Sequence, residues 1–301
     1  MLAHLWMPIT LIASCLQTAR NATQASLTST LGAVGSAQVR FLYGLPFALL
    51  FLSAQLLVSR EALPPIGAPT LAFALAGAAA QIVATVLMLV AMRMKSFAVT
   101  TATTKTEPVL VALFGVVVLG DRPSLGAWFA ILIATTGVVV MSLRPYRGGS
   151  FDRDGAAAIG LGILSGAFFA IAAIGFRGAI LAVPAGSFYL RATSVLTISL
   201  GMQTVMLLAY LGIFDRPALT KSFAVWRVSL GAGLFGALAS QFWFLGFALT
   251  SAANVRTLAL VEVLMAQAVQ GRVFAQRATR RELLGMTLIV IGAGALIIAT
   301  G

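Results

Sequence analysis

The sequence predicts an all-α polytopic membrane protein, with ten transmembrane helices in two inverted five-helix repeats around a central cavity. Three observations lead to this fold class. Hydrophobic residues make up 60% of the chain and charged residues 9%, whereas soluble domains average about 45–50% and 25%. Apolar segments of about 20 residues, the length that crosses a bilayer, recur from end to end. Residue patterns of the first half return in the second half.

The ten expected spans follow one another with only short loops between them. They cover residues 5–27, 36–59, 69–92, 96–119, 124–142, 156–182, 187–212, 223–249, 252–271 and 282–300. The first and fourth are the least apolar, so nine spans is the main alternative. The short loops leave no room for a soluble domain. The opening apolar stretch lacks a basic start, so we expect no cleavable signal peptide.

The duplication is visible residue by residue. Glu107 and Glu262 are separated by the same 155 residues as Gly137 and Gly292, and residues 35–40 (GSAQVR) recur as residues 186–191 (GSFYLR). The repeats are expected at 1–148 and 152–301, joined by a polar run. Because each half has an odd number of spans, the second half must enter the membrane inverted. Inverted repeats place a substrate site at their interface, near the midplane.

The formal net charge of +12 would suggest nucleic acid as a partner of a soluble protein. Here the basic residues flank spans, so we expect contact with membrane lipid and no binding of nucleic acid. Most of them lie in loops after odd-numbered spans: Arg93, Lys95, Arg144, Arg147, Arg153, Arg216, Lys221, Arg227, Arg272, Arg277, Arg280 and Arg281. The positive-inside rule therefore predicts cytoplasmic odd-numbered loops and termini outside the cytoplasm.

Two carboxylates are the most informative residues of the chain. Of the eight acidic residues, only Glu107 and Glu262 lie inside apolar spans. A charge at the bilayer centre costs about 2.5–3.5 kcal/mol on insertion scales, so it usually marks a substrate or ion pathway. We expect Glu107 or Glu262 to exchange a proton and couple it to transport. The alternative is that each is the permanent ion-pair partner of a neighbouring cation.

Polar side chains inside other spans are candidates for binding a solute. Span one carries a stripe of polar residues at helical spacing, which are Thr10, Ser14, Gln17, Asn21 and Gln24. This stripe either lines a cavity or hydrogen-bonds to neighbouring helices. Lys105 and Arg20 are deep cations that suit a carboxylate; if Lys105 instead neutralises a glutamate, the cavity could accept lipophilic cations. Arg256 and Arg177 lie near span ends, where anchoring is expected. The candidate substrate-binding residues are Gln17, Arg20, Asn21, Gln24, Gln81, Thr104, Lys105, Gln241 and Trp243.

Span four also predicts a local break in its helix. Pro108 has no backbone N–H and leaves a carbonyl one turn earlier unpaired. Threonines at positions 100, 101, 103, 104 and 106 precede it, and their hydroxyls can hydrogen-bond to the freed backbone.

Residues 107–124 (EPVLVALFGVVVLGDRPS) resemble the signature helix and turn of EamA proteins in the drug/metabolite transporter superfamily. Residues 137–141 (GVVVM) and 39–42 (VRFL) fit the same family. The resemblance implies a ten-helix inner-membrane carrier with two EamA repeats, which in many members exports amino acids or related metabolites. This chain departs from the family at Asp121, where a glutamate is usual, at Gln276, and in lacking a proline after Glu262. The resemblance also implies cytoplasmic termini, against the charge distribution, and we adopt the family arrangement as the expectation.

The function expected from the sequence is a secondary transporter in the plasma (inner) membrane that exports amino acids or related small metabolites by alternating access, with protons as a candidate coupling ion. The alternative is a multidrug or organic-cation exporter of the same fold, and after it a non-transporting membrane protein or an intramembrane enzyme. An enzyme is not expected, because His4 is the only histidine and no catalytic triad appears. Cys15 is the only cysteine, so neither a disulfide nor a metal site is expected. No cofactor is expected, and the sequence leaves monomer or homodimer open.

Overall fold

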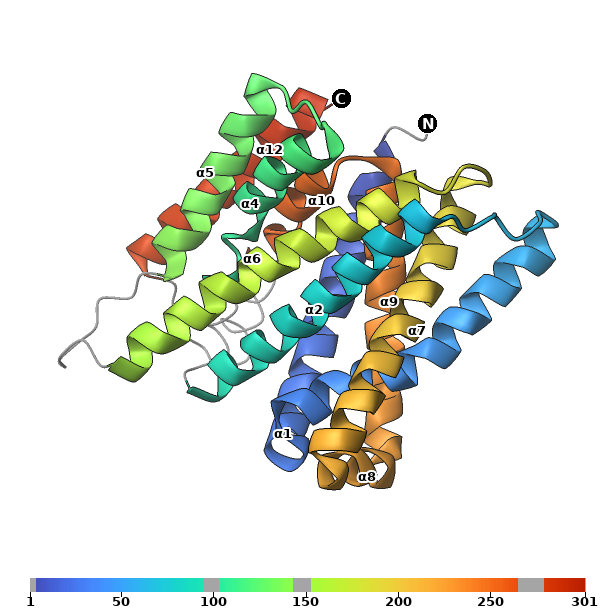
Figure 1. The fold of residues 1–301 in the computed structure, drawn as a ribbon. Helices are drawn as coiled ribbons and strands as arrows, with labels where there is room; N and C mark the ends of the chain where they lie inside the picture. The colour runs from blue at the N-terminus through green and yellow to red at the C-terminus, as the bar shows by residue number, and fades with distance from the viewer. Residues whose placement is uncertain (1–3, 95–102, 143–152, 265–278, 301) are drawn as a thin grey trace.

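The computed structural model describes residues 4–94, 103–142, 153–264 and 279–300, and within these ranges all regular structure is helical (Figure 1). The elements are α1 (Trp6–Ser59), α2 (Ala68–Met94), α4 (Glu107–Phe114), the π-helix η2 (Gly115–Leu119), α5 (Leu125–Ser142), α6 (Arg153–Leu181), α7 (Phe188–Phe214), α8 (Arg216–Ala224), α9 (Trp226–Leu249), α10 (Ala252–Leu258) and α12 (Arg280–Thr300). In the described part, six helices are long and apolar enough to cross a membrane, namely α1, α2, α6, α7, α9 and α12. The chain is therefore an integral multi-pass membrane protein.

Helix α1 contains two of the expected spans, because the chain reverses at Gly32 (Figure 1). Gly32 has φ 71°, a conformation that residues with a Cβ rarely adopt. The two legs are fastened by Gln24 and Ser36: the Ser36 hydroxyl donates to the Gln24 carbonyl at 2.6 Å, and the Gln24 amide donates to the Ser36 carbonyl at 3.2 Å. Residues 6–31 and 33–59 thus form a helical hairpin over the predicted spans 5–27 and 36–59.

The other long helices overlie the spans predicted at 69–92, 124–142, 156–182, 187–212, 223–249 and 282–300. The short helix α8 was not predicted; Asp215 caps it by accepting a hydrogen bond from the Ala218 N–H at 3.1 Å. Spans four and nine are described only in part, since 96–102 and 265–271 lie outside the described residues. The linker residues 143–152 also lie outside them. The count of ten and the division into two repeats therefore stay predictions.

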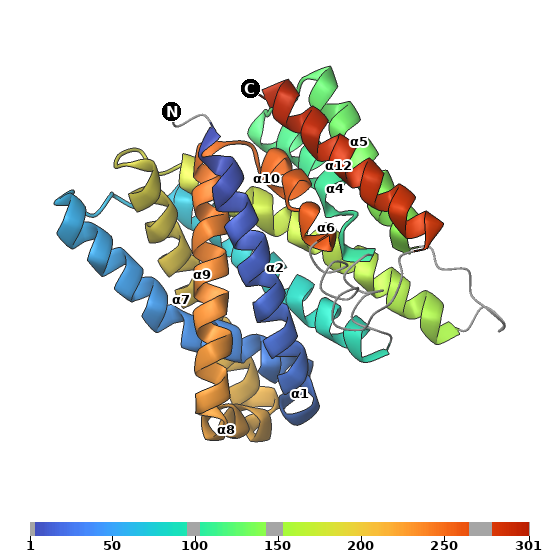
Figure 2. The ribbon, with the colours of Figure 1, turned by 180° about the vertical axis from the view of Figure 1, so that it is seen from behind.

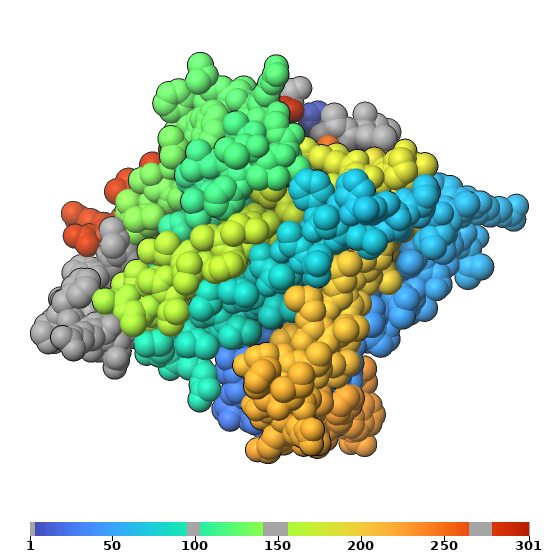
Figure 3. Space-filling model, viewed as in Figure 1, coloured from blue at the N-terminus to red at the C-terminus, as the bar shows by residue number. Residues whose placement is uncertain are grey.

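Close helix pairs build the bundle, and small residues allow their approach. Helix α2 packs along α6, where a Cβ on Gly175 would lie 2.8 Å from the Gly77 backbone; Figure 3 shows these two helices side by side across one face. Helix α5 packs along α12, where a Cβ on Gly292 would lie 2.6 Å from Ala134. Helix α9 packs along α1 (Figure 2).

The two ends of the bundle differ in charge. The N- and C-termini lie at the same end in both ribbon views (Figures 1 and 2). The opposite end holds α8 with Lys221, the end of α2 with Arg93, and the start of α12 with Arg280. These basic residues belong to the loops after odd-numbered spans, so those loops share one end of the bundle, as the sequence predicted.

The outer surface of the bundle is apolar, and a set of polar side chains is buried within a largely apolar core. Val58 and Ile298 are 86% and 84% exposed, as suits side chains that face lipid. The span-one stripe is turned inward, and its buried members are Thr10, Ser14, Asn21 and Gln24, with Arg20 beside them. The candidate site lies among these buried polar side chains.

Candidate functional site

Two helices are interrupted at matching places in the middle of the bundle. In span four, Lys105 and Thr106 form a turn before α4 starts at Glu107. In span nine, residues 259–260 form a turn after α10, and helical structure resumes at 261. Broken helices near the membrane midplane expose backbone and bring charged side chains to one point, which is how many transporters build their substrate sites.

The break in span four has the chemistry predicted from Pro108. Pro108 lies in the first turn of α4, where a missing N–H costs little because that position has no helical partner. The Thr106 hydroxyl donates to the Thr103 carbonyl at 3.1 Å, so a threonine hydrogen-bonds to backbone at the interruption, as expected. The second interruption occurs without a proline.

The two breaks are joined by two crossed ion pairs. Lys105 Nζ donates to Glu262 Oε2 at 2.7 Å, with side chains 9% and 5% exposed. Arg256 Nε lies 3.0 Å from Glu107 Oε1, with side chains 8% and 7% exposed. Span four therefore supplies the cation of one pair and the carboxylate of the other, and span nine supplies their partners. This matches the alternative reading of both glutamates, as ion-pair partners in the described conformation.

Glu262 is also held by the polar stripe of α1. Its Oε1 accepts a hydrogen bond from the Thr18 hydroxyl at 3.1 Å, and its Oε2 accepts a longer one from the Gln17 amide at 3.5 Å. Gln17 Oε1 in turn accepts a hydrogen bond from the Trp243 indole N–H at 3.0 Å. Glu262 thus has three donors, whereas the Glu107–Arg256 contact lacks hydrogen-bond geometry at Glu107 Oε1 and Arg256 Nε.

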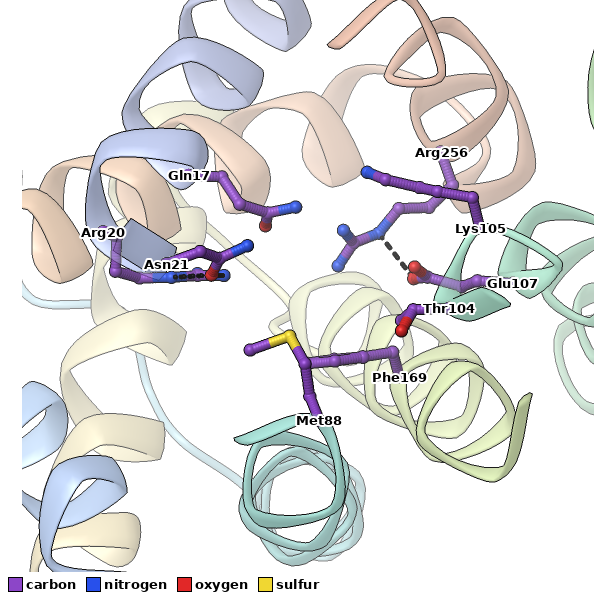
Figure 4. Close-up of a pocket in the computed structure, with 9 residues that line it drawn as sticks. All are labelled: Gln17, Arg20, Asn21, Met88, Thr104, Lys105, Glu107, Phe169 and Arg256. Carbon is purple, nitrogen blue, oxygen red and sulfur yellow. Dashed lines mark hydrogen bonds and ion pairs between the residues drawn. The ribbon is translucent and has the colours of Figure 1, made fainter. Parts of the chain in front are cut away.

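A small cavity lies between these groups (Figure 4). Its lining residues are Gln17, Arg20, Asn21, Met88, Thr104, Lys105, Glu107, Phe169 and Arg256. It leaves about 20 Å³ for the centre of a water-sized group, which is room for about one water molecule. A larger solute enters only if the walls separate, so the described conformation is a constricted one.

Among the described residues, more cationic than anionic side chains are buried. Arg20 donates through Nε and Nη2 to the amide oxygen of its neighbour Asn21, at 3.1 and 2.7 Å. Arg40 donates to the Thr85 and Ser240 hydroxyls at 3.4 and 3.5 Å. Among the acidic residues whose side chains the structure describes, none forms an ion pair with either arginine.

The cavity brings together part of the predicted site. Gln17, Arg20, Asn21, Thr104, Lys105 and Glu107 line it, and Glu262 is one contact away through Lys105. The remaining four candidates bond elsewhere among the described residues. Gln24 fastens the α1 hairpin, Gln81 accepts from Gln203 at 2.8 Å, Gln241 donates to Thr193 at 2.7 Å, and Trp243 packs behind Gln17 and Arg256. In the described conformation these four do not line the cavity, and their role in binding a solute stays a prediction.

Arg256 is not the span-end anchor that the sequence predicted. It is 7% exposed, and its guanidinium lies 4.4 Å from the Trp243 ring centre as well as beside Glu107. Arg177 also turns into the protein, where it pairs with Asp121 at 3.3 Å and donates to the Phe247 and Thr250 carbonyls. Both residues lie within about a turn of a helix end, but the adjacent turns fold over them, which sequence position alone does not reveal.

Met88 and Phe169 line the cavity without having been predicted. Both stand in ordinary apolar helices, so no feature of the sequence distinguishes them from lipid-facing neighbours. No group of three metal-ligating side chains occurs in the part of the chain that the structure describes.

The comparisons with known proteins agree with this architecture. Residues 5–143 match the model of the EamA-like transporter family. No curated protein matches the chain. In all, 29 chains of solved structures match, and one, described as "Crystal structure of protein", has a TM-score of 0.69 over 97% of this chain and 96% of that chain at 13% identity. At this identity the likeness shows the fold alone.

Proposed function

We propose that the chain is a secondary transporter of the drug/metabolite transporter type, which moves a small solute through the central cavity by alternating access. The observation that carries the proposal is the pair of interrupted helices joined by crossed ion pairs in the middle of an apolar bundle. Buried charge at this depth is costly and is retained where a pathway needs it. The family match over residues 5–143 supports the same function.

The proposal includes a second EamA repeat over residues 152–301, inverted relative to the first repeat at 1–148. The helix contacts support it, because exchanging the halves maps the main pairs onto one another. Span one packs on span eight through Gln17 and Trp243, as span six packs on span three through Gly175 and Gly77. The repeat mates Gly137 and Gly292 both lie where α5 meets α12. The crossed ion pairs likewise join span four to its mate, span nine.

The proposed solutes are amino acids or related small metabolites, exported across the plasma (inner) membrane. Organic cations are the alternative. The sequence made organic cations depend on the neutralisation of a glutamate by Lys105, and Lys105 does pair with Glu262. The charges around the cavity argue against them: Arg20, Lys105 and Arg256 outnumber Glu107 and Glu262, and a cationic solute would add to this excess.

Uptake into liposomes that contain the purified full chain tests the proposal. The panel is labelled amino acids, 2-oxo acids, nucleosides and organic cations, with protein-free liposomes as the blank. Thr104→Phe fills the cavity and should abolish uptake, whereas Thr220→Phe places the same ring on an exposed position of α8 and should leave uptake unchanged. Both variants are first checked for a monodisperse folded peak. Uptake that is absent with every solute, or equal in the two variants, contradicts the proposal.

Proton coupling through Glu107 or Glu262 is the second part of the proposal. Glu107 lines the cavity and has the less complete set of hydrogen bonds, so it is the better placed of the two to gain and lose a proton during the cycle. Glu107→Gln should remove the pH dependence of transport, and Glu262→Gln should mainly reduce the yield of folded protein. If both variants fold and transport with unchanged pH dependence, neither carboxylate couples protons.

A further inference from the structure

The charges around the cavity do not balance. Glu107 and Glu262 are each engaged by a cation, and Glu262 already accepts from three donors. Arg20 and Arg40 are 2% and 1% exposed, and neither forms an ion pair with a carboxylate within the described ranges. Uncompensated charge of this kind is retained in a membrane interior when a ligand or an ion supplies the counter-charge.

Arg20 is the uncompensated cation that a solute can reach, because it lines the cavity. Its Nε and Nη2 both donate to the single Oδ1 atom of Asn21. These two nitrogens form the fork that binds a carboxylate with two parallel hydrogen bonds. The present partner is a neutral amide on the adjacent residue, so a ligand carboxylate can replace it without breaking a contact between helices (Figure 4).

Arg40 strengthens this preference from behind the cavity. It donates only to the Thr85 and Ser240 hydroxyls, both at long distances, and its Nε has no hydrogen-bond partner. Arg20 and Arg40 each lie one helical turn beyond the Gln24–Ser36 contact on the two legs of α1, so their charges repel. An anion at Arg20 relieves this repulsion, and a neutral or cationic ligand does not.

We infer that the transported solute is a monocarboxylate with net negative charge, bound by Arg20, rather than a zwitterionic amino acid or an organic cation. This inference rests on the proposed transport function and, within its proposed solutes, selects anionic metabolites over amino acids. An ammonium group is stabilised best by a carboxylate, and Glu107 and Glu262 are both in ion pairs. Met88 and Phe169 supply a thioether and a ring on the cavity wall, which suit an apolar body attached to the carboxylate.

Three probes with one carbon skeleton test the inference: 4-methyl-2-oxopentanoate is an anion, leucine a zwitterion and leucinamide a cation. Liposomes with the purified full chain should accumulate the oxo acid at least about tenfold faster than either other probe, the factor expected for a charge-assisted pair. Leucine or leucinamide taken up at least as fast as the oxo acid overturns the inference and leaves transport standing. No uptake of any probe contradicts the proposed function and this inference with it.

Variants of Arg20 test whether the preference for an anionic solute depends on the charge of this residue. Arg20→Gln should lower oxo-acid uptake at least about tenfold, and Arg20→Lys should recover part of it, because a cation returns without the fork. Arg93→Gln removes an equal charge from an exposed position and should leave uptake unchanged. Binding of the oxo acid to detergent-solubilised protein, followed by thermal shift, gives a second readout that needs no transport. If the oxo acid still shifts the melting temperature of Arg20→Gln, or if this variant loses uptake of all three probes equally, the assignment of binding to Arg20 is overturned.

Discussion

Neutralising both members of the Lys105–Glu262 pair should harm the protein far less than neutralising one. At 2.7 Å and an effective dielectric constant of about 20, the attraction is about 6 kcal/mol. Desolvation offsets part of this, and breaking a buried pair costs about 3–5 kcal/mol in practice. Lys105→Met and Glu262→Gln should each lose about that much unfolding free energy. The double variant should lose less than about 2 kcal/mol, since no buried charge is left unpaired.

Denaturant titration of the four proteins in mild detergent measures these losses, with the folded fraction followed by tryptophan fluorescence. The expected coupling energy between the two sites is at least about 3 kcal/mol. The control cycle uses Arg177→Met and Asp121→Asn, whose pair is longer at 3.3 Å and more exposed at 13% and 16%, so its coupling should be about 1 kcal/mol or less. Losses at Lys105 and Glu262 that simply add would refute the reasoning that each compensates the other's buried charge.

Three further predictions concern packing, pH and orientation. Gly292→Ala should destabilise the protein by about 1–3 kcal/mol, because its Cβ would lie 2.6 Å from a neighbouring helix, whereas Gly294→Ala meets nothing within 4 Å and should not; melting temperatures of the two variants compare them directly. The pKa of Glu61, in the loop after α1, is lowered by hydrogen bonds from the Ser187 backbone N–H and the Tyr189 hydroxyl, so its stabilising contribution is present above about pH 4.5 and lost as pH falls through its lowered pKa. Glu61→Gln should therefore flatten the fall in melting temperature toward acid pH, and an unchanged profile would exclude this role. The basic loops lie at the end opposite the termini, so the positive-inside rule predicts an active periplasm-dependent reporter at the C-terminus. The family arrangement, which we expect, predicts instead a silent reporter there and an active cytoplasmic one, and an active periplasm-dependent reporter would overturn it.

Much of the fold follows from the length and polarity of segments. Apolar runs of about 20 residues locate helices such as α2 and α12, because a helix of this length crosses the bilayer with its backbone hydrogen bonds satisfied. The apolar runs predict two spans here but not how they are joined. Gly32, with its positive φ, makes the reversal so tight that helical geometry continues on both sides of it. The helix α8, with 9 residues, is too short to show the span-length apolar pattern that reveals the other helices.

The candidate site was predictable where charge forces the outcome. Glu107, Glu262 and Lys105 had to lie inside the bundle, because neither lipid nor an apolar helix surface can solvate them. The assignment of Lys105 to Glu262 and of Arg256 to Glu107 depends on how two broken helices face each other. That relation is tertiary, so sequence spacing within either span did not contain it.

The crossed ion pairs also impose an order on biosynthesis. Lys105 and Glu107 are translated about 150 residues before Glu262 and Arg256, their partners in the finished protein. At about 5–20 residues per second, the ribosome needs roughly 10–30 s to close that gap. During this interval the broken fourth span carries charges whose partners do not yet exist, so it is poorly suited to be released into lipid. We therefore expect the fourth span to stay in the insertion machinery or at the water boundary until the second half arrives to neutralise its charges.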